Sequence, residues 1–253
     1  MKFLIFKKKN LKYLFIVALT LILLAINVNG NSAQVYFGIA PRLVPIYRVD
    51  TEEKKVAITF DSAWGADKTL DIIKTLNEYN AKATFFLVGF WVEKYPEMVS
   101  ALKDNGIEIG THSNTHPDFA KLSKEQMGLE LSTSMELISN ITGKKPTLFR
   151  APYGSYNNDV INTASSLGLT TIQWDVDTLD WKGLSAMDIC NRVLNNVQEG
   201  SIILCHNNAD HILEALPLIL DRLYKKGYTV TSVGDLIYDS DYTIDNLGIQ
   251  HKN

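Results

Sequence analysis

The sequence has few cysteines and few long apolar runs, and its net charge is small. Its 253 residues include only two cysteines, Cys190 and Cys205, and carry a formal net charge of −3. Export would permit a disulfide, but we favour two separate buried thiols. The hydrophobic content of 46% is ordinary for a globular protein, which argues against general disorder. The length suits one sizeable α/β domain.

Acidic residues are missing from the first 49 positions. Residues 1–30 hold five lysines, and an apolar run from Tyr13 to Ile26 follows these lysines. This order is typical of a signal peptide, with cleavage expected near Val28–Gly30 or after Ala33. The run is shorter than the roughly 20 apolar residues of a membrane span, and an uncleaved anchor is the alternative. We expect an exported domain, extracellular or attached to the cell envelope, with membrane contact only through this segment.

The sequence lacks the features of two common classes of binding protein, those that bind nucleic acids and those that bind nucleotides. Without residues 1–30 the formal charge becomes −8, and an acidic domain is a poor nucleic-acid binder because that function requires a basic face. No glycine-rich phosphate loop follows the first apolar run, at residues 56–60, which argues against a nucleotide-binding Rossmann fold. We find neither internal repeats nor low-complexity tracts.

Short apolar runs alternate with amphipathic segments from Val56 onward. Strands are expected at 56–60, 83–89, 107–111, 147–149, 170–175, 201–205 and 228–233, and helices at 68–79, 96–106, 123–143, 157–168, 185–200 and 212–227. This alternation predicts a parallel sheet with helices outside it. About seven such units closing on themselves predict an α/β fold of the (β/α) barrel type, and a flat doubly wound sheet is the rival.

The same patterns divide the chain into four parts. These are a leader at 1–30, an N-terminal extension at 34–55, a barrel domain at 56–237 and a polar tail at 238–253. The long helix at 123–143 has clear ends in the sequence. Ser123 and Gln126 form a capping-box pattern at its start, and Gly143 is placed to end it.

Polar residues follow the predicted strands at the point where each strand ends. They are Asp61, His112, Arg150, Asp175, Asp177 and His206. In a parallel barrel those ends share one face, and that face carries the active site. Five separated segments therefore converge on one mouth. Asp175 and Asp177 are expected at most to support the site, because carboxylates at a loop start commonly accept backbone N–H bonds.

The two histidines of "HSNTH", His112 and His116, are four residues apart. This spacing lets both imidazoles reach one ion. The pattern alone is weak, because two unrelated histidines can have the same spacing. Beside Asp61 it indicates a zinc site, since two histidines and one carboxylate are a common ligand set.

Six segments carry a resemblance to a known family. They are "TFD" (59–61), "ATFFLVG" (83–89), "GIEIGTHSNTHP" (106–117), "RAPYG" (150–154), "WDVDTLDW" (174–181) and "ILCH" (203–206). In order and spacing they resemble the motifs of the polysaccharide deacetylases, also called the NodB-homology or carbohydrate esterase family 4 enzymes. The resemblance covers roughly residues 56–237. The leader and the "WG" at Trp64–Gly65 look most like the sporulation-associated PdaB-like subgroup.

The resemblance implies a distorted (β/α) barrel that hydrolyses the N-acetyl group of an amino sugar in a cell-envelope polysaccharide such as peptidoglycan. It also implies a role for each matching residue. Asp61 would be the general base, His206 the general acid, Arg150 the partner of a site carboxylate, Asp180 the partner of His206, Tyr153 an oxyanion donor through its N–H, Trp181 and Leu204 the walls of the acetyl pocket, and His112 and His116 the ligands of zinc or another divalent metal. Trp174 is expected to be a core aromatic residue.

Ser62 departs from the family pattern, which has a carboxylate metal ligand directly after the base. A neutral hydroxyl is a weak ligand and brings no compensating charge. Loss of the anionic ligand should weaken metal binding. The candidate substitutes are Asp67, at the start of the following helix, and Asp118, two residues past His116.

Three hypotheses follow. The first is an active peptidoglycan deacetylase with a modified metal site, favoured by the retained base, acid and histidines. The second is a catalytically weak or inactive glycan-binding protein of the same fold, favoured by Ser62. The third is a barrel glycosidase using paired carboxylates such as Asp61 and Asp177, which would leave the histidine pair without a role.

Overall fold

The computed structural model describes residues 12–13, 15–21 and 41–253. The chain forms two compact units, 1–42 and 43–253. Most of the expected leader, both expected cleavage sites and the first part of the extension lie outside the described residues. Within the residues that are described, no helix is both long enough and apolar enough to span a bilayer.

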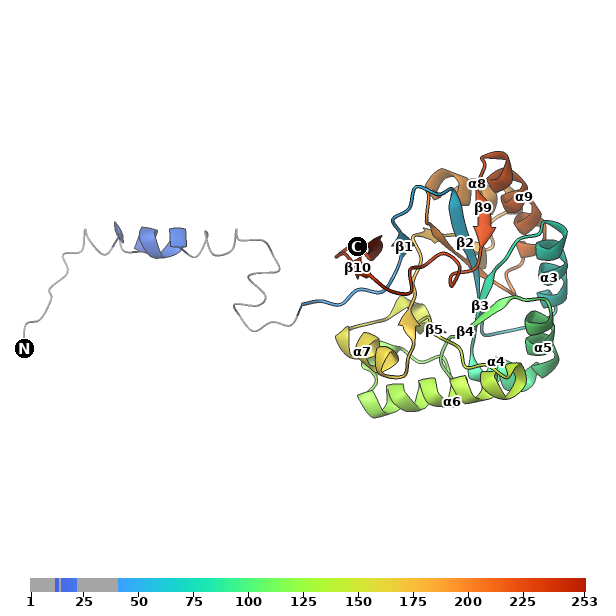
Figure 1. Ribbon diagram of the computed structural model, residues 1–253, viewed down its shortest axis with the longest axis horizontal. Helices are drawn as coiled ribbons and strands as arrows, with labels where there is room; N and C mark the ends of the chain where they lie inside the picture. The colour runs from blue at the N-terminus through green and yellow to red at the C-terminus, as the bar shows by residue number, and fades with distance from the viewer. Residues whose placement is uncertain (1–11, 14, 22–40) are drawn as a thin grey trace, which may run out of the picture. The chain divides into compact units, whose positions relative to one another are not determined.

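Seven parallel strands form the central sheet of the second unit (Figure 1). Across the sheet they run β6 (Thr170–Thr171), β5 (Leu148–Phe149), β4 (Glu108–Thr111), β3 (Thr84–Leu87), β2 (Lys55–Ser62), β8 (Ile202–His206) and β7 (Val176–Asp177). An eighth strand, β9 (Thr229–Thr231), pairs with the beginning of β2. The sheet curls into a half-barrel, which confirms the predicted parallel (β/α) architecture over the flat alternative.

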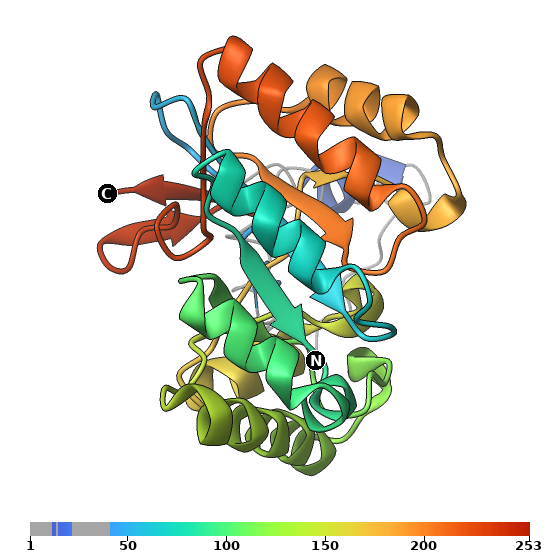
Figure 2. The same cartoon turned by 90° about the vertical axis from the view of Figure 1, so that its right-hand side faces the viewer.

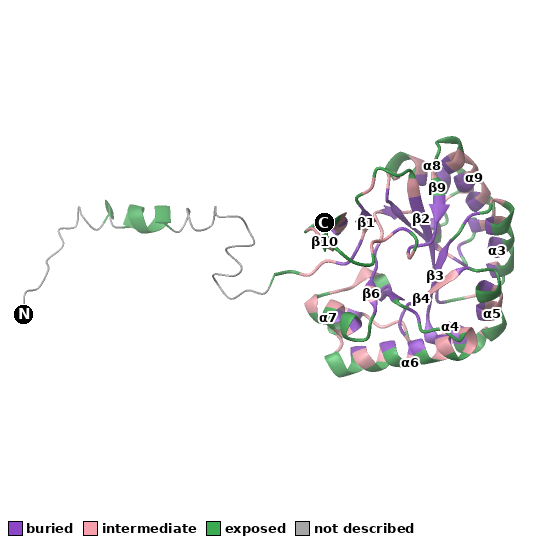
Figure 3. Ribbon diagram, viewed as in Figure 1, coloured by how far each residue is buried: buried purple, intermediate pink, exposed green. Residues whose placement is uncertain are grey.

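Helices cover the outer face of the sheet (Figure 2). They are α3 (Thr69–Glu78), α4 (Gly89–Lys94), α5 (Pro96–Asp104), α6 (Lys124–Thr142), α7 (Asn158–Ser166), α8 (Ala186–Asn196) and α9 (Ile212–Lys225), with short 3-10 turns η1 (Phe119–Lys121), η2 (Pro152–Gly154) and η3 (Asp180–Lys182). The helix faces toward the sheet are buried and the outward faces are exposed (Figure 3). Both ends of α6 confirm the sequence: Ser123 and Gln126 form the capping box, and Gly143 is left-handed with φ 73°.

In the described part of the chain, two of the three clusters of buried apolar side chains lie on the two faces of the sheet, and the third surrounds Phe119 and Phe149. Of the first two, the larger lies between the sheet and the helices and includes Phe60, Phe85 and Trp91. The smaller lies on the inner face of the sheet and includes Phe86 and Ile172. Complete burial of each such side chain contributes about 1.5 to 3 kcal/mol.

The N-terminal extension links the chain that follows β6 to the chain that precedes β8. Ile46 pairs with Ile172 beyond β6, and Arg48 pairs with Ser201 just before β8. Backbone bonds from Ile46 N to Thr171 O (3.1 Å) and from Gln173 N to Ile46 O (2.7 Å) fix this connection. Of the expected strand at 170–175, only Thr170–Thr171 forms a strand, β6, because the chain that follows pairs with Ile46 of the extension. The strand β7 begins beyond the expected bounds, at Val176.

The polar tail is part of the same compact unit, a role its sequence did not predict. β10 (Tyr242–Ile244) and β11 (Ile249–Lys252) form a hairpin, and β11 pairs in parallel with β1 (Arg48–Val49) of the extension. Gln250 of β11 is fully buried. Its side-chain Oε1 accepts the Tyr238 N–H at 2.9 Å, which ties the hairpin to the chain that precedes it.

Candidate active site

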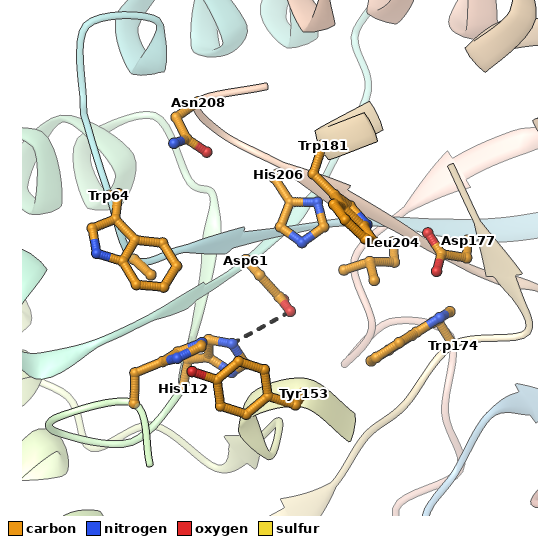
Figure 4. Close-up of a pocket in the computed structure, with 12 residues that line it drawn as sticks. Asp61, Trp64, His112, Tyr153, Trp174, Asp177, Trp181, Leu204, His206 and Asn208 are labelled. Carbon is orange, nitrogen blue, oxygen red and sulfur yellow. Dashed lines mark ion pairs between the residues drawn. The ribbon is translucent and has the colours of Figure 1, made fainter. Parts of the chain in front are cut away.

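A pocket of about 570 Å³ opens at the C-terminal ends of the strands (Figure 4). It is lined by Asp61, Ala63, Trp64, His112, His116, Tyr153, Trp174, Asp177, Trp181, Leu204, His206 and Asn208. The expected convergence of separated segments is therefore present. The parallel pairing of β2 with β8 places Asp61 directly beside His206.

Asp61 is a buried carboxylate held from below by a fully buried guanidinium. Arg150 Nη1 donates to Asp61 Oδ1 and to Thr59 Oγ1, both at 2.8 Å. Burial alone would raise the pKa of Asp61, but the positive charge of Arg150, assisted by His112 and His206, lowers it below its ordinary value. The carboxylate is therefore ionised at neutral pH, and the lowered pKa also limits its basicity.

His206 has a fixed orientation. Its Nδ1 lies 2.7 Å from Asp180 Oδ1, and its backbone N–H donates to Asp180 Oδ2 at 2.8 Å. Burial would lower the pKa of His206, yet the hydrogen bond and charge of Asp180 outweigh burial and raise it. With Nδ1 engaged, Nε2 is the nitrogen left to exchange a proton with a bound molecule.

The pKa values of His112 and His116 are shifted downward, in the opposite direction to that of His206. His112 Nδ1 lies 2.7 Å from the Arg150 carbonyl oxygen, which makes Nδ1 the protonated nitrogen and leaves the Nε2 lone pair free. The rings of His112 and His116 are 5.0 Å apart. Burial lowers the pKa of both, to about 4 for His116. Both imidazoles are neutral at pH 7, which is the form that binds metals.

Ser62, the last residue of β2, is completely buried, and its Oγ has no hydrogen-bond partner. The His116 Nδ1 atom is likewise buried without a partner. Among the described residues, no group of three or more His, Cys, Asp or Glu side chains is placed to hold a metal. Two neutral imidazoles that line the pocket are thus available to a divalent metal, and Ser62 is not among the residues that line it.

The two carboxylates considered as substitutes for the third ligand lie elsewhere. Asp67 is exposed and is not among the residues that line the pocket. Asp118 accepts a hydrogen bond from Ser155 Oγ and pairs with Lys121 Nζ at 2.9 Å. Neither compensates for Ser62 in this structure.

The remaining predicted residues are distributed around the pocket. Trp181 and Leu204 lie together on one side of Asp61 (Figure 4). Asp177 also lines the pocket and accepts the Leu179 N–H at 2.8 Å, as expected of a carboxylate at a loop start. Asp175 points instead to Ser201 and Ile202 and does not line the pocket.

Trp174 has the expected contact with the core and, in addition, a place in the pocket wall. The Arg150 guanidinium lies 5.5 Å from its ring centroid and 4.2 Å from that of Phe86. Trp174 therefore helps to hold the cation that orients Asp61.

Backbone strain is concentrated around the site. Six described non-glycine residues have positive φ, and Ser113 (77°), His116 (61°), Tyr153 (59°) and Leu179 (52°) belong to loops that surround the pocket. Such conformations cost about 1 kcal/mol or more each and persist where the surroundings enforce them. The Tyr153 ring is 70% exposed and contacts His116 edge-on at 4.7 Å.

Sequence reasoning missed the residue that holds the histidine loop. Glu130 of α6 accepts the N–H groups of Asn114 (2.9 Å) and Thr115 (2.7 Å), and the Thr115 hydroxyl donates to it at 2.6 Å. Ser113 Oγ accepts the His116 N–H at 2.9 Å. Glu130 is one of several acidic residues on α6, and nothing in the helix pattern distinguishes it.

Comparison with known proteins agrees with this geometry. Residues 48–172 match the family model described as polysaccharide deacetylase. The uncharacterized protein YlxY of Bacillus subtilis is 33% identical over 193 residues, which are 76% of this chain and 60% of YlxY. A peptidoglycan-N-acetylglucosamine deacetylase of Bacillus cereus is 33% identical over 196 residues, which are 76% of this chain and 92% of that protein. The chain thus spans less than two thirds of the first relative's length.

Solved structures give the same result. BA3943 from Bacillus anthracis, described as a CE4 family pseudoenzyme, aligns with a TM-score of 0.75 at 31% identity over 83% of this chain and 73% of that one. A BA3943 mutant described as having restored enzymatic activity aligns with a TM-score of 0.74 at 34% identity, over 76% and 71% of the two chains. Motifs, fold and similarity together identify this chain as a member of the polysaccharide deacetylase family, carbohydrate esterase family 4, whose enzymes are generally metal-dependent hydrolases of amide bonds.

Proposed function

We propose that this chain removes the N-acetyl group from an amino sugar of peptidoglycan. The observation that carries the proposal is the pairing of Asp61 with His206 at one pocket. One is an ionised carboxylate held by Arg150, and the other is an imidazole held by Asp180. A fixed base beside a fixed acid is what hydrolysis of an amide requires.

In the proposed reaction the ionised Asp61 takes a proton from water as the water oxygen attacks the acetyl carbon. The Tyr153 N–H stabilises the negative charge that develops on the carbonyl oxygen. His206 then protonates the amine nitrogen as the C–N bond breaks, which releases acetate and the free amino sugar. His112 and His116 would hold a divalent metal such as zinc, which would polarise the acetyl carbonyl and lower the pKa of the attacking water.

Acetate release from purified peptidoglycan, in buffer containing zinc, tests this proposal. We expect release by the wild-type chain and a loss of about 10²- to 10⁴-fold in the Asp61→Asn and His206→Gln variants. Asp67→Asn is the matched control, because Asp67 is exposed and outside the pocket. Release of reducing ends without acetate would instead support a glycosidase.

Binding without turnover is the second candidate, and Ser62 is the observation that favours it. Its partnerless hydroxyl stands where the family pattern has an anionic metal ligand. The similarity to BA3943, a described pseudoenzyme, supports the same view. Sedimentation with insoluble peptidoglycan, in the absence of acetate release, would identify the chain as a glycan-binding protein.

We further propose that the chain is exported and belongs to the PdaB-like subgroup, with a role in sporulation. The basic and apolar N-terminal segment and the "WG" pair support this assignment. Fractionation of a spore-forming host that expresses a C-terminally tagged chain tests the location, and N-terminal sequencing tests cleavage. Recovery of the intact chain from the cytosol would contradict export.

A further inference from the structure

Trp64 is an exposed aromatic side chain at a place where the family motifs do not require one. It lies two residues after Ser62, lines the pocket, and is 58% exposed. Its ring contacts His116 edge-on at 5.1 Å and lies 6.4 Å from the Phe90 ring. An exposed indole at the mouth of a pocket is a common mark of ligand recognition.

The loop that carries Trp64 is held rigidly by buried groups. The Gly65 carbonyl accepts the indole N–H of Trp91 at 2.7 Å and the Asn207 side-chain amide at 3.0 Å. The Trp91 side chain is fully buried. Since this backbone is ordered by the fold itself, a ligand that contacts Trp64 loses little affinity to ordering it.

The same loop is joined to the loop that follows β8. Lys68 Nζ donates to the carbonyl oxygens of Ala209 (2.7 Å), Asp210 (3.2 Å) and Asn208 (3.4 Å). Asn208 lines the pocket together with Trp64. An aromatic face and an amide are thereby presented on two connected loops.

Trp64 and the expected acetyl pocket lie on opposite sides of Asp61. Figure 4 shows Trp64 on one side of this carboxylate, with Trp181 and Leu204 on the other. A sugar whose acetyl group lies between Trp181 and Leu204 therefore has its reacting carbon near Asp61. The next sugar of the chain then extends toward Trp64.

We propose that Trp64 is the stacking platform of a second saccharide subsite, and that Asn208 contributes an amide hydrogen bond to the same sugar. The apolar C–H face of a pyranose suits the electron-rich face of an indole. The amide group of Asn208 both donates to and accepts from sugar hydroxyls and acetamido groups. The inference rests on the proposed function, because it assumes that the pocket receives an N-acetylated glycan.

Calorimetric titration of the full chain with N-acetylglucosamine and with its β-1,4-linked tetramer tests the subsite. We expect the wild type to bind the tetramer more tightly than the monomer. Trp64→Ala should lower tetramer affinity about tenfold and leave monomer affinity unchanged, because stacking contributes on the order of 1 kcal/mol and only the longer ligand reaches Trp64. Trp64→Phe should retain most of the affinity.

Leu129→Ala is the matched control, since Leu129 is an exposed apolar residue of α6 (68% exposed) outside the pocket. Asn208→Ala gives a second variant that should weaken tetramer binding alone. Unchanged tetramer binding in both Trp64→Ala and Asn208→Ala would overturn the subsite and leave the proposed function intact. Failure of the wild type to bind either sugar would overturn glycan recognition itself, and the subsite with it.

Discussion

The two walls of the pocket differ in how completely their polar groups are satisfied. On the wall from β8 and η3, His206 makes two hydrogen bonds to the buried Asp180. On the wall from β2 and the loop after β4, His116 Nδ1 is buried without a partner, and so is the hydroxyl of Ser62, which ends β2 but does not itself line the pocket. Buried polar atoms are rarely left unpaired, so the unpaired Nδ1 of His116, which lines the pocket, is a candidate contact for a bound group.

The two walls also show how their surroundings shift the pKa values of histidine residues in opposite directions. A carboxylate behind His206 raises its pKa and suits it to hold and deliver a proton. A backbone carbonyl behind His112 leaves burial as the dominant effect, which lowers its pKa and suits the ring to bind a metal. The group that contacts Nδ1 therefore determines whether a histidine of this pocket is suited to proton transfer or to metal binding.

We expect the largest effect on stability from breaking the ion pair between Arg150 and Asp61, which lies between the two walls. Arg150→Met leaves the buried Asp61 carboxylate without its cation, which should lower the free energy of unfolding by about 3 to 5 kcal/mol. Urea denaturation measures the loss. The double variant Arg150→Met, Asp61→Asn removes the isolated charge and should recover part of it. Equal stability of the wild type and Arg150→Met would mean that the pair does not stabilise the site.

Ser62→Asp should make the second wall resemble a complete metal site. A carboxylate beside His112 and His116 should strengthen zinc binding by about 2 to 3 kcal/mol, because an anionic ligand replaces a neutral one. Competition against a zinc-sensitive dye measures the change, with Asp67→Ala as a control expected to leave affinity unaltered. If Ser62→Asp binds zinc no better than the wild type, position 62 does not face the ion.

Asp180→Asn should weaken the first wall and leave the second intact. Hydrogen bonds to charged groups contribute about 1.5 to 3 kcal/mol, and part of this should be lost. Because the folded-state pKa of His206 is raised, its stabilisation is complete below about 6.5 and disappears as pH rises through the folded value. NMR titration of His206 should show a lower pKa in the variant, and an unchanged pKa would contradict the role of Asp180.

Glu130→Gln should have the smallest effect, confined to the loop of His112 and His116. Weaker bonds to the Asn114 and Thr115 N–H groups should cost about 1 kcal/mol of stability. Metal affinity measured on the Ser62→Asp background should fall about tenfold, as for other residues that orient metal ligands. Glu136→Gln, an exposed acid on the same helix, is the control. Equal metal affinities in the Glu130→Gln and Glu136→Gln variants would contradict a role for Glu130 in orienting the metal ligands.

The sequence predicted the parts of this structure that depend on local pattern. Apolar runs located the strands, and their order placed Asp61, His112 and His206 at one mouth because parallel strands share a direction. Capping at Ser123 and Gly143 was also readable, since it requires only neighbouring residues. These features need no knowledge of distant contacts.

The features that escaped prediction depend on contacts between distant segments. Glu130 contacts Thr115 and Asn114 of the histidine loop, which lie 15 and 16 positions earlier in the sequence, and no periodicity distinguishes it. Ile46 pairs with the chain at Ile172 and Gln173, so the strand expected at 170–175 is shortened to Thr170–Thr171. Trp64 was noted as part of a subgroup pattern, yet only its position opposite Trp181 and Leu204 suggests contact with a sugar.

Zinc binding, measured by equilibrium dialysis, tests the central claim most directly. The claim is that two imidazoles bind a metal ion here without a carboxylate as the third protein ligand. The comparison is between the full wild-type chain and the His112→Ala, His116→Ala double variant, with circular dichroism to verify that both are folded. We predict saturable binding of about one zinc ion by the wild type and its loss in the double variant. Binding by the wild type no stronger than that of the double variant would contradict the claim and favour glycan binding without catalysis.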